Sequence, residues 1–185
     1  MTDSGMTQVR FGGFGGQGII LAGSLLGKAA SLYGGKEAVF TQAYGPEARG
    51  GACRADVIIS DEPVGYPYVS QPDILAIMFQ EAYVNFGSEL KPGGVLIVEQ
   101  ELVKPDTEKA PALALPATRI ATELGNRIVA NVVLLGFLVA VTGVVSPDAV
   151  EQAIRSTIKK KALDLNLRAF AAGMAQASTS AQVSQ

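Results

Sequence analysis

Short apolar runs that predict β-strands alternate with longer amphipathic stretches that predict helices over the first two thirds of the chain. A short unbroken apolar run is typical of a strand that is buried on both faces of a sheet. The alternation of strand and helix favours an α/β fold, a three-layer sandwich in which helices flank a mainly parallel sheet. The predicted strands are residues 9–13, 38–42, 55–60, 74–79, 95–98 and 113–115, and the helices predicted between them are residues 21–32 and 81–90.

The last third of the chain is predicted to be helical. A serine cap and a first-turn proline begin a helix at Pro147, and a second helix follows over residues 163–174, where apolar residues recur at helical spacing. Residues 177–185 are small and polar and lack periodicity. We therefore expect one domain over residues 1–176 and a flexible tail over residues 177–185.

Residues 128–145 are almost wholly apolar, and their length is close to the minimum for a membrane-spanning helix. Asn131 and Thr142 interrupt this segment, and Gly136 and Gly143 weaken it as a helix. A helix that is apolar all round is also typical of the centre of a soluble domain. We therefore predict a buried core helix and no membrane association.

The composition argues against several classes of function. The net charge is −2, so the chain has no long-range attraction for nucleic acid or anionic lipid. It has no histidine, and Cys53 is its only cysteine, so it lacks the usual ligands of zinc and iron–sulfur clusters. Cys53 is expected to be a small buried hydrophobic residue. Residues 1–8 lack the pattern of a secretory signal, so we expect a cytoplasmic protein.

A glycine-rich turn follows the first predicted strand. The segment Gly13-Phe14-Gly15-Gly16-Gln17-Gly18 satisfies G-x-G-x-x-G between a predicted strand and a predicted helix. Its glycines supply positive φ angles, and their amides point towards whatever lies at the helix start, for which an anion is the natural occupant. A dinucleotide fingerprint also needs an acidic residue at the end of the second strand, where Thr41 and Gln42 stand. Dinucleotide binding, binding of a phosphate or carboxylate of another molecule, contact with a loop of a neighbouring subunit and a purely structural turn all stay open.

A second glycine-rich loop, Tyr44-Gly45-Pro46-Glu47-Ala48-Arg49-Gly50-Gly51, follows the second predicted strand. Taken alone, Glu47 and Arg49 have the pattern of ordinary solvated loop charges. Sites in α/β proteins, however, form where loops follow the carboxyl ends of strands. We therefore expect this loop to converge with the glycine turn.

Together these two motifs resemble the γ subunits of 2-oxoacid:ferredoxin oxidoreductases, which carry G-x-G-G-Q-G near their start and Y-G-P-E-x-R-G-G further on. Within that family, Glu-x-Arg-Gly-Gly looks more like the 2-oxoglutarate branch than the pyruvate branch. The resemblance covers most of the chain. It extends through Arg54, Ile58-Ile59-Ser60-Asp61, Gln71-Pro72-Asp73, Gly125-Asn126-Arg127 and Asn131.

The resemblance implies a subunit of a complex that converts 2-oxoglutarate, coenzyme A (CoA) and oxidised ferredoxin into succinyl-CoA, CO2 and reduced ferredoxin. Companion α, β and δ chains would hold the thiamine diphosphate, magnesium and iron–sulfur clusters and would pass electrons to ferredoxin. This chain would hold no metal and no catalytic residue, and would supply an assembly surface and part of the CoA site. Pyruvate, 2-oxoisovalerate or indolepyruvate as substrate, a free-standing dinucleotide-binding oxidoreductase and self-pairing of the isolated chain stay open.

We expect the amides of the glycine turn and the guanidinium of Arg49 to face an anionic group, with Glu47 holding Arg49 in place. Arg54 is a weaker candidate, because it can equally pair with Asp56 or Glu62 at the surface. Asn126 and Asn131 are expected to cap or cross-link the buried helix. The predicted binding residues are Gly15, Gly16, Gln17, Gly18, Glu47, Arg49 and Gly50.

Overall fold

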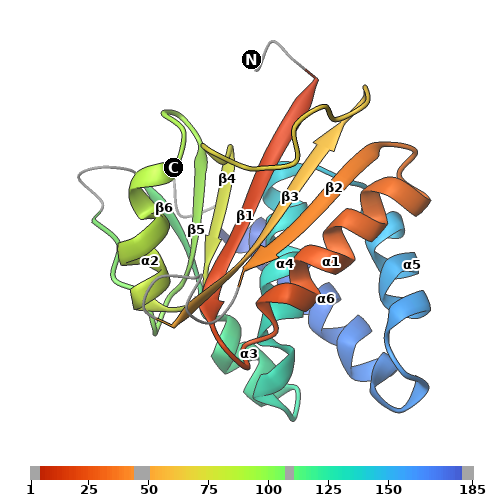
Figure 1. Cartoon of the computed structure of the whole chain (residues 1–185). Helices are drawn as coiled ribbons and strands as arrows, with labels where there is room; N and C mark the ends of the chain where they lie inside the picture. The colour runs from red at the N-terminus through yellow and green to blue at the C-terminus, as the bar shows by residue number, and fades with distance from the viewer. Residues whose placement is uncertain (1–4, 44–50, 107–110, 181–185) are drawn as a thin grey trace.

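The computed structural model describes residues 5–43, 51–106 and 111–180, which form a six-stranded mixed sheet covered by helices (Figure 1). The strands lie in the order β2-β3-β1-β4-β5-β6. Their bounds are β1 (Met6–Phe14), β2 (Glu37–Ala43), β3 (Ala52–Ser60), β4 (Ile74–Ile77), β5 (Val95–Glu99) and β6 (Ala112–Leu115).

The expectation of a mainly parallel sheet is only partly confirmed, because the sheet also contains antiparallel pairs. Strand β1 pairs in parallel with β4, and the parallel pairing continues through β5 to β6. Strand β3 lies antiparallel between β1 and β2. A short connection can join antiparallel neighbours, whereas parallel neighbours need a long crossover. The short connection from β2 to β3 therefore favours the antiparallel pairing, and β3 separates β1 from β2, the strand that follows β1 in the chain.

Helices cover both faces of the sheet, so the three-layer arrangement is confirmed (Figure 1). A large core joins one face to α1, α3, α4, α5 and α6, and a smaller core joins the other face to α2. The helices are α1 (Ile19–Lys28), continued by a π-helical turn η1 (Ala29–Tyr33), α2 (Gln80–Phe86) with η3 (Gly87–Glu89), α3 (Ala117–Glu123), η4 (Arg127–Val129), α4 (Ala130–Thr142), α5 (Pro147–Thr157) and α6 (Lys160–Ser180).

Strand β4 shows how the sequence serves both cores. Successive side chains of a strand point to opposite faces of the sheet. Ile74 and Ala76 belong to the large core, whereas Leu75 and Ile77 belong to the smaller core beneath α2. A continuous apolar run is therefore required here, as the sequence predicted for a strand buried on both faces.

The apolar segment predicted as a core helix is α4, and it is buried on nearly all sides. Gly136, which the sequence analysis described as weakening this helix, is also a point of close contact with α6. A Cβ atom on Gly136 would lie 2.2 Å from the carbonyl oxygen of Phe170, and one on Gly173 would lie 2.0 Å from that of Val133. The backbones of α4 and α6 are therefore in direct contact where the two helices cross. Among the residues described by the structure, no helix is both long enough and apolar enough to cross a membrane.

Both helices of the last third form where the sequence predicts them. Ser146 caps α5, because its Oγ accepts a hydrogen bond of 3.3 Å from the amide of Ala149, and Pro147 stands in the first turn. Helix α6 continues to Ser180, past the point at which we expected a flexible tail to begin. Ala177 packs against the large core, and alanine favours the helix, so the predicted boundary at residue 177 falls within the last turns of α6.

Candidate functional site

The glycine turn lies at a topological switch point of the sheet. After β1 the chain passes to α1, which packs on one face, and after β4 it passes to α2, which packs on the other. The carboxyl ends of these adjacent parallel strands therefore open a crevice between them. Ligands of doubly wound α/β proteins bind in such a crevice.

The turn presents backbone amides that lack partners in the helix. Gly16 and Gly18 adopt positive φ angles of 90° and 75°, which glycine accepts without strain. The first intrahelical hydrogen bond of α1 runs from Ala22 to the carbonyl of Gly18, at 3.0 Å, and no side chain caps this helix. The amides of Ile19 and Ile20 therefore have no intrahelical acceptor, and Gly16 is exposed beside them.

Gln17 holds the crevice in shape. Its side-chain oxygen accepts a hydrogen bond of 2.8 Å from the amide of Phe14. Its side-chain nitrogen donates one of 3.2 Å to the carbonyl of Met78, the residue that follows β4. Both ends of the amide are thus engaged within the chain, and the side chain ties the ends of the two strands together.

Asn131 joins the turn to the buried helix, as the sequence analysis expected. Its side-chain nitrogen donates a hydrogen bond of 2.9 Å to the carbonyl of Gly18. A Cβ atom on Gly18 would lie 2.5 Å from that nitrogen, so only glycine fits here. Asn126 caps η4, because its side-chain oxygen accepts a hydrogen bond of 3.1 Å from the amide of Ile128. The expected capping and cross-linking roles of both asparagines are confirmed.

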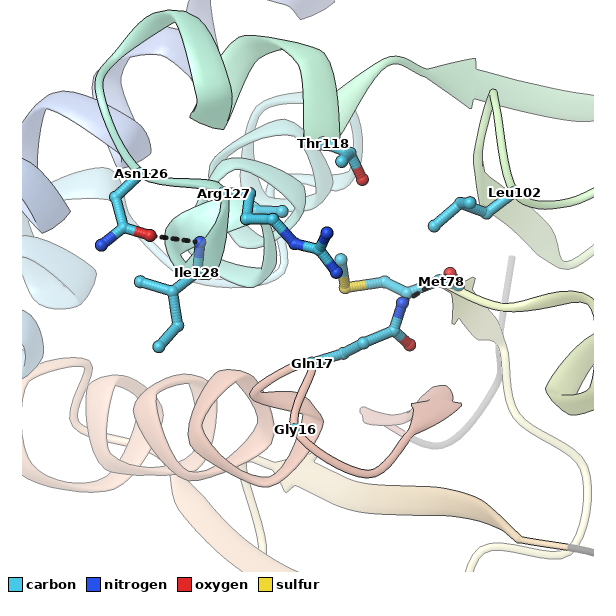
Figure 2. A pocket seen from close by; sticks show the side chains of 9 residues that line it. Gly16, Gln17, Met78, Leu102, Thr118, Asn126, Arg127 and Ile128 are labelled. Carbon is cyan, nitrogen blue, oxygen red and sulfur yellow. Dashed lines mark hydrogen bonds between the residues drawn. The ribbon is translucent and has the colours of Figure 1, made fainter.

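A cavity of about 360 Å³ opens between the glycine turn and η4 (Figure 2). Arg127 reaches into it, and its guanidinium points towards Gln17 and Met78. Among the described residues, no carboxylate forms an ion pair with Arg127. The cavity is lined by Gly16, Gln17, Met78, Leu102, Thr118, Asn126, Arg127, Ile128 and Ala130.

Sequence reasoning did not include Arg127 in the site. The segment Gly125-Asn126-Arg127 carried part of the family resemblance but received no binding role. This motif gives only local information. The proximity of Arg127 to Gln17 arises from the packing of α4 against the turn.

Glu99 is a second residue that sequence reasoning missed. Its carboxylate is fully buried at the end of β5, where it accepts hydrogen bonds from three backbone amides. One oxygen accepts from Thr118 at 3.1 Å, and the other accepts from Glu101 and Leu102 at 2.7 and 2.8 Å. A buried carboxylate needs such partners. Glu99 therefore positions the cavity wall formed by Leu102 and Thr118.

Three of the predicted binding residues, Glu47, Arg49 and Gly50, lie outside the described residues. The residues that flank this loop are described. Ala52 pairs with Phe14 across β3 and β1, and a Cβ atom on Gly51 would lie 3.4 Å from the ring of Phe14. Gly51 and Ala52, at the start of β3, therefore lie beside Phe14 of the glycine turn.

Arg54 pairs with Asp56, which is one of the two partners expected for it. The Nε atom of Arg54 lies 3.7 Å from the carboxylate of Asp56. That carboxylate also binds the buried Arg10. The arrangement gives Arg54 a structural partner beside the sheet.

Cys53 is buried in the large core, as expected for a small hydrophobic residue. Burial raises the pKa of its thiol, so the thiol stays protonated near neutral pH. Within the described ranges, no group of three or more histidine, cysteine, aspartate or glutamate residues is placed to hold a metal ion.

The fold and the crevice together define a doubly wound α/β protein with a glycine-rich turn at its switch point. Proteins of this class bind ligands at the carboxyl ends of their strands. The family follows from comparison with known proteins. The chain belongs to the pyruvate ferredoxin/flavodoxin oxidoreductase family, whose model matches residues 8–176. The resemblance recognised from the two glycine-rich motifs is thereby confirmed.

Individual relatives agree with this assignment. The chain is 49% identical over 172 residues to the 2-oxoglutarate synthase subunit KorC of Methanocaldococcus jannaschii, covering 90% of this chain and 91% of that protein. It is 42% identical to the γ subunit of a keto/oxoacid ferredoxin oxidoreductase from Geobacter sulfurreducens, with a TM-score of 0.81 and coverage of 94% and 99%.

A third relative shares the fold alone. This is a 2-oxoglutarate:ferredoxin oxidoreductase from Magnetococcus marinus, solved with 2-oxoglutarate, CoA and succinyl-CoA bound. The identity is 24% and the TM-score 0.84, and the match covers 96% of this chain but 32% of that one. The same fold therefore also occurs as part of a longer chain.

Proposed function

We propose that this chain is the γ subunit of a 2-oxoglutarate:ferredoxin oxidoreductase, which converts 2-oxoglutarate, CoA and oxidised ferredoxin into succinyl-CoA, CO2 and reduced ferredoxin. The observation that carries the proposal is the 49% identity to a 2-oxoglutarate synthase subunit over nearly the full length of both chains. The Glu-x-Arg-Gly-Gly segment, Glu47 to Gly51, agrees with the same branch of the family.

Companion α, β and δ chains complete the enzyme in this proposal. A single cysteine and the absence of histidine leave this chain without ligands for an iron–sulfur cluster. The residues present do not fit the magnesium ion of thiamine diphosphate either, since the described part of the chain offers no acidic cluster for it. The companion chains therefore carry these centres and the transfer of electrons to ferredoxin, and the assembled enzyme works in the cytoplasm.

The contribution of this chain is to bind and orient CoA, whose phosphate groups are anionic. The amides of Gly15, Gly16 and Gly18, together with Arg49, form the anion-binding side of the crevice, and Glu47 orients Arg49. Gln17 keeps the turn open by its bonds to Phe14 and Met78. The fixed phosphates direct the CoA thiol towards the thiamine centre of a companion chain.

Reconstitution tests the assignment. The chain is co-expressed with candidate α, β and δ chains, and ferredoxin reduction is measured with CoA and each of four oxoacids: 2-oxoglutarate, pyruvate, 2-oxoisovalerate and indolepyruvate. We expect a stable complex with the highest kcat/KM for 2-oxoglutarate. A complex that forms and works equally well without this chain would contradict the proposal, as would micromolar binding of NAD, NADP or FAD by the chain alone.

The anion-binding role is tested separately in the assembled enzyme. Arg49→Ala is expected to raise the KM for CoA about tenfold, because a charge-assisted hydrogen bond to phosphate is lost. Arg155, which pairs with Glu151 on the surface of α5, offers a matched control. Arg155→Ala is expected to leave the KM unchanged. Unchanged CoA kinetics and unchanged assembly in Arg49→Ala would leave the second loop with a structural role only.

A further inference from the structure

The cavity beside the glycine turn is lined by residues 126–130 and by four segments that each follow a strand. Gln17 follows β1, Met78 follows β4, Leu102 follows β5, and Thr118 follows β6. All four segments leave the carboxyl ends of parallel strands, so the cavity lies where this fold class binds ligands. Its volume of about 360 Å³ is within the range of small-molecule sites.

The backbone that carries Arg127 is held on both sides. Helix α3 ends at Glu123, and Gly125, with a φ of 111°, then reverses the chain. The amide of Asn126 donates a hydrogen bond of 3.1 Å to the carbonyl of Ala121. On the other side the Asn126 side chain caps η4 through Ile128. Arg127 thus stands in a fixed turn, and its side chain extends into the cavity (Figure 2).

The cavity combines this cation with apolar walls. Met78, Leu102 and Ile128 supply apolar surface. Most other arginines of the described chain have carboxylate partners, such as Asp56 for Arg10 and Asp164 for Arg168. Arg127 has no such partner among the described residues, although its guanidinium offers a planar fork suited to phosphate or carboxylate.

We propose that this cavity holds a phosphate-bearing part of the acyl acceptor, with Arg127 as a specificity-determining residue that binds a phosphate group. The inference rests on the proposed function and adds to it a binding residue, Arg127, and a binding site, the cavity beside the glycine turn. Phosphate is favoured over the carboxylate of the oxoacid, because the oxoacid must reach the thiamine centre in a companion chain. The amides of the glycine turn lie at the same cavity and suit the same charge.

The test uses Arg127→Gln in the assembled oxidoreductase. We expect the KM for CoA to rise about tenfold or more, with kcat and the KM for 2-oxoglutarate nearly unchanged. Pantetheine carries the same thiol without phosphates, so with pantetheine as acceptor the variant and the unmodified enzyme should behave alike. Dephospho-CoA separates the groups, because it lacks the 3′-phosphate: if the penalty persists, Arg127 binds the diphosphate, and if it disappears, Arg127 binds the 3′-phosphate.

Two control variants accompany the test. Arg127→Lys keeps the charge but loses the fork, so an intermediate KM is expected. Arg155→Gln removes an arginine from the surface of α5 and should leave all constants unchanged. Gel filtration of each complex shows whether assembly is intact.

Four results would overturn the inference: an unchanged KM for CoA, an equal penalty with pantetheine, a raised KM for 2-oxoglutarate instead, or loss of assembly in Arg127→Gln. If the unmodified complex oxidises 2-oxoglutarate, each of these results would leave the proposed function standing. A complex that does not oxidise 2-oxoglutarate at all would contradict the proposed function itself.

Discussion

Arg10 on β1 and Asp56 on β3 form a two-pronged ion pair that is almost completely buried. The Nε atom of Arg10 donates to one carboxylate oxygen at 2.7 Å and its Nη2 atom donates to the other at 2.9 Å. The side chains are 1% and 4% exposed. Arg10 also binds Glu89 of η3 and the carbonyl of Val69. Burial alone lowers the pKa of Arg10, but its bonds to Asp56 and Glu89 outweigh this effect and raise it.

Removing Arg10 is expected to destabilise the fold strongly. Arg10→Met leaves the buried carboxylate of Asp56 without its main partner, which costs roughly 3–5 kcal/mol in the free energy of unfolding measured in urea. In Arg10→Met/Asp56→Leu the unpaired carboxylate is also gone, so this double variant should be more stable than the single one. A double variant no more stable than Arg10→Met would show that desolvated charge is not the cause. Lys91, half-exposed in its pair with Asp73, is the control, and Lys91→Met should cost less than about 1 kcal/mol.

Two glycines of the turn should respond differently to alanine. Gly18→Ala places a Cβ against Asn131 at a residue with φ of 75°, so we expect a loss of about 2 kcal/mol or more in stability. Gly15 has open space at its Cβ position and no left-handed φ, so Gly15→Ala should change stability by less than about 0.5 kcal/mol. A raised KM for CoA in the stable Gly15→Ala variant would support close approach of the ligand to this backbone. An unchanged KM would place the ligand elsewhere.

The crossing of α4 and α6 should tolerate no side chain at position 173. Gly173→Ala drives a Cβ into the carbonyl of Val133, so the helices must move apart, at a cost of about 3 kcal/mol despite the better helix propensity of alanine. Thermal and urea unfolding would measure the loss. Ala171 lies exposed on the same helix, and Ala171→Gly should cost only about 0.5–1 kcal/mol. Similar losses for the two changes would contradict the close crossing.

Cys53 should react slowly with alkylating agents in the folded chain. Its thiol is buried and its pKa is raised, so little thiolate is present or accessible at neutral pH. The urea-unfolded chain is the control and should react at least about tenfold faster. Because the folded state keeps this proton to a higher pH than the unfolded state, the free energy of unfolding should fall as pH rises above about 8.5, the ordinary pKa of cysteine. Cys53→Ala should reduce that decline, and equal alkylation rates would contradict the burial.

Local patterns predicted most elements of the fold. The unbroken apolar run from Ile74 was correctly predicted as a doubly buried strand, and the cap at Ser146 correctly marked the start of α5. These predictions succeed because the cause lies within a few residues, in side-chain spacing and in hydrogen bonds to the nearest amides. The end of α6 was missed, because packing of Ala177 on the core extends the helix beyond the last strong periodic signal.

The strand order of the sheet and its mixture of parallel and antiparallel pairs could not be predicted from local sequence patterns. Strands β1 and β2 are consecutive in the sequence, yet β3 lies between them in antiparallel pairing. A strand's own residues specify its faces but not its neighbour, since the pairing is made by backbone groups that every residue carries. The buried partner of Arg10 was unforeseeable for the same reason.

By itself the sequence determined the chain's family, its alternating strands and helices, and a glycine turn suited to an anion, because motifs, periodicity and positive φ angles are local properties. The tertiary structure alone decided what surrounds that turn. It brings Arg127 to the cavity beside Gln17 and directs the amide of Gln17 to Met78. Those contacts join residues far apart in the chain, and only the packing of α4 and the parallel pairing of β1 with β4 place them within reach of one another.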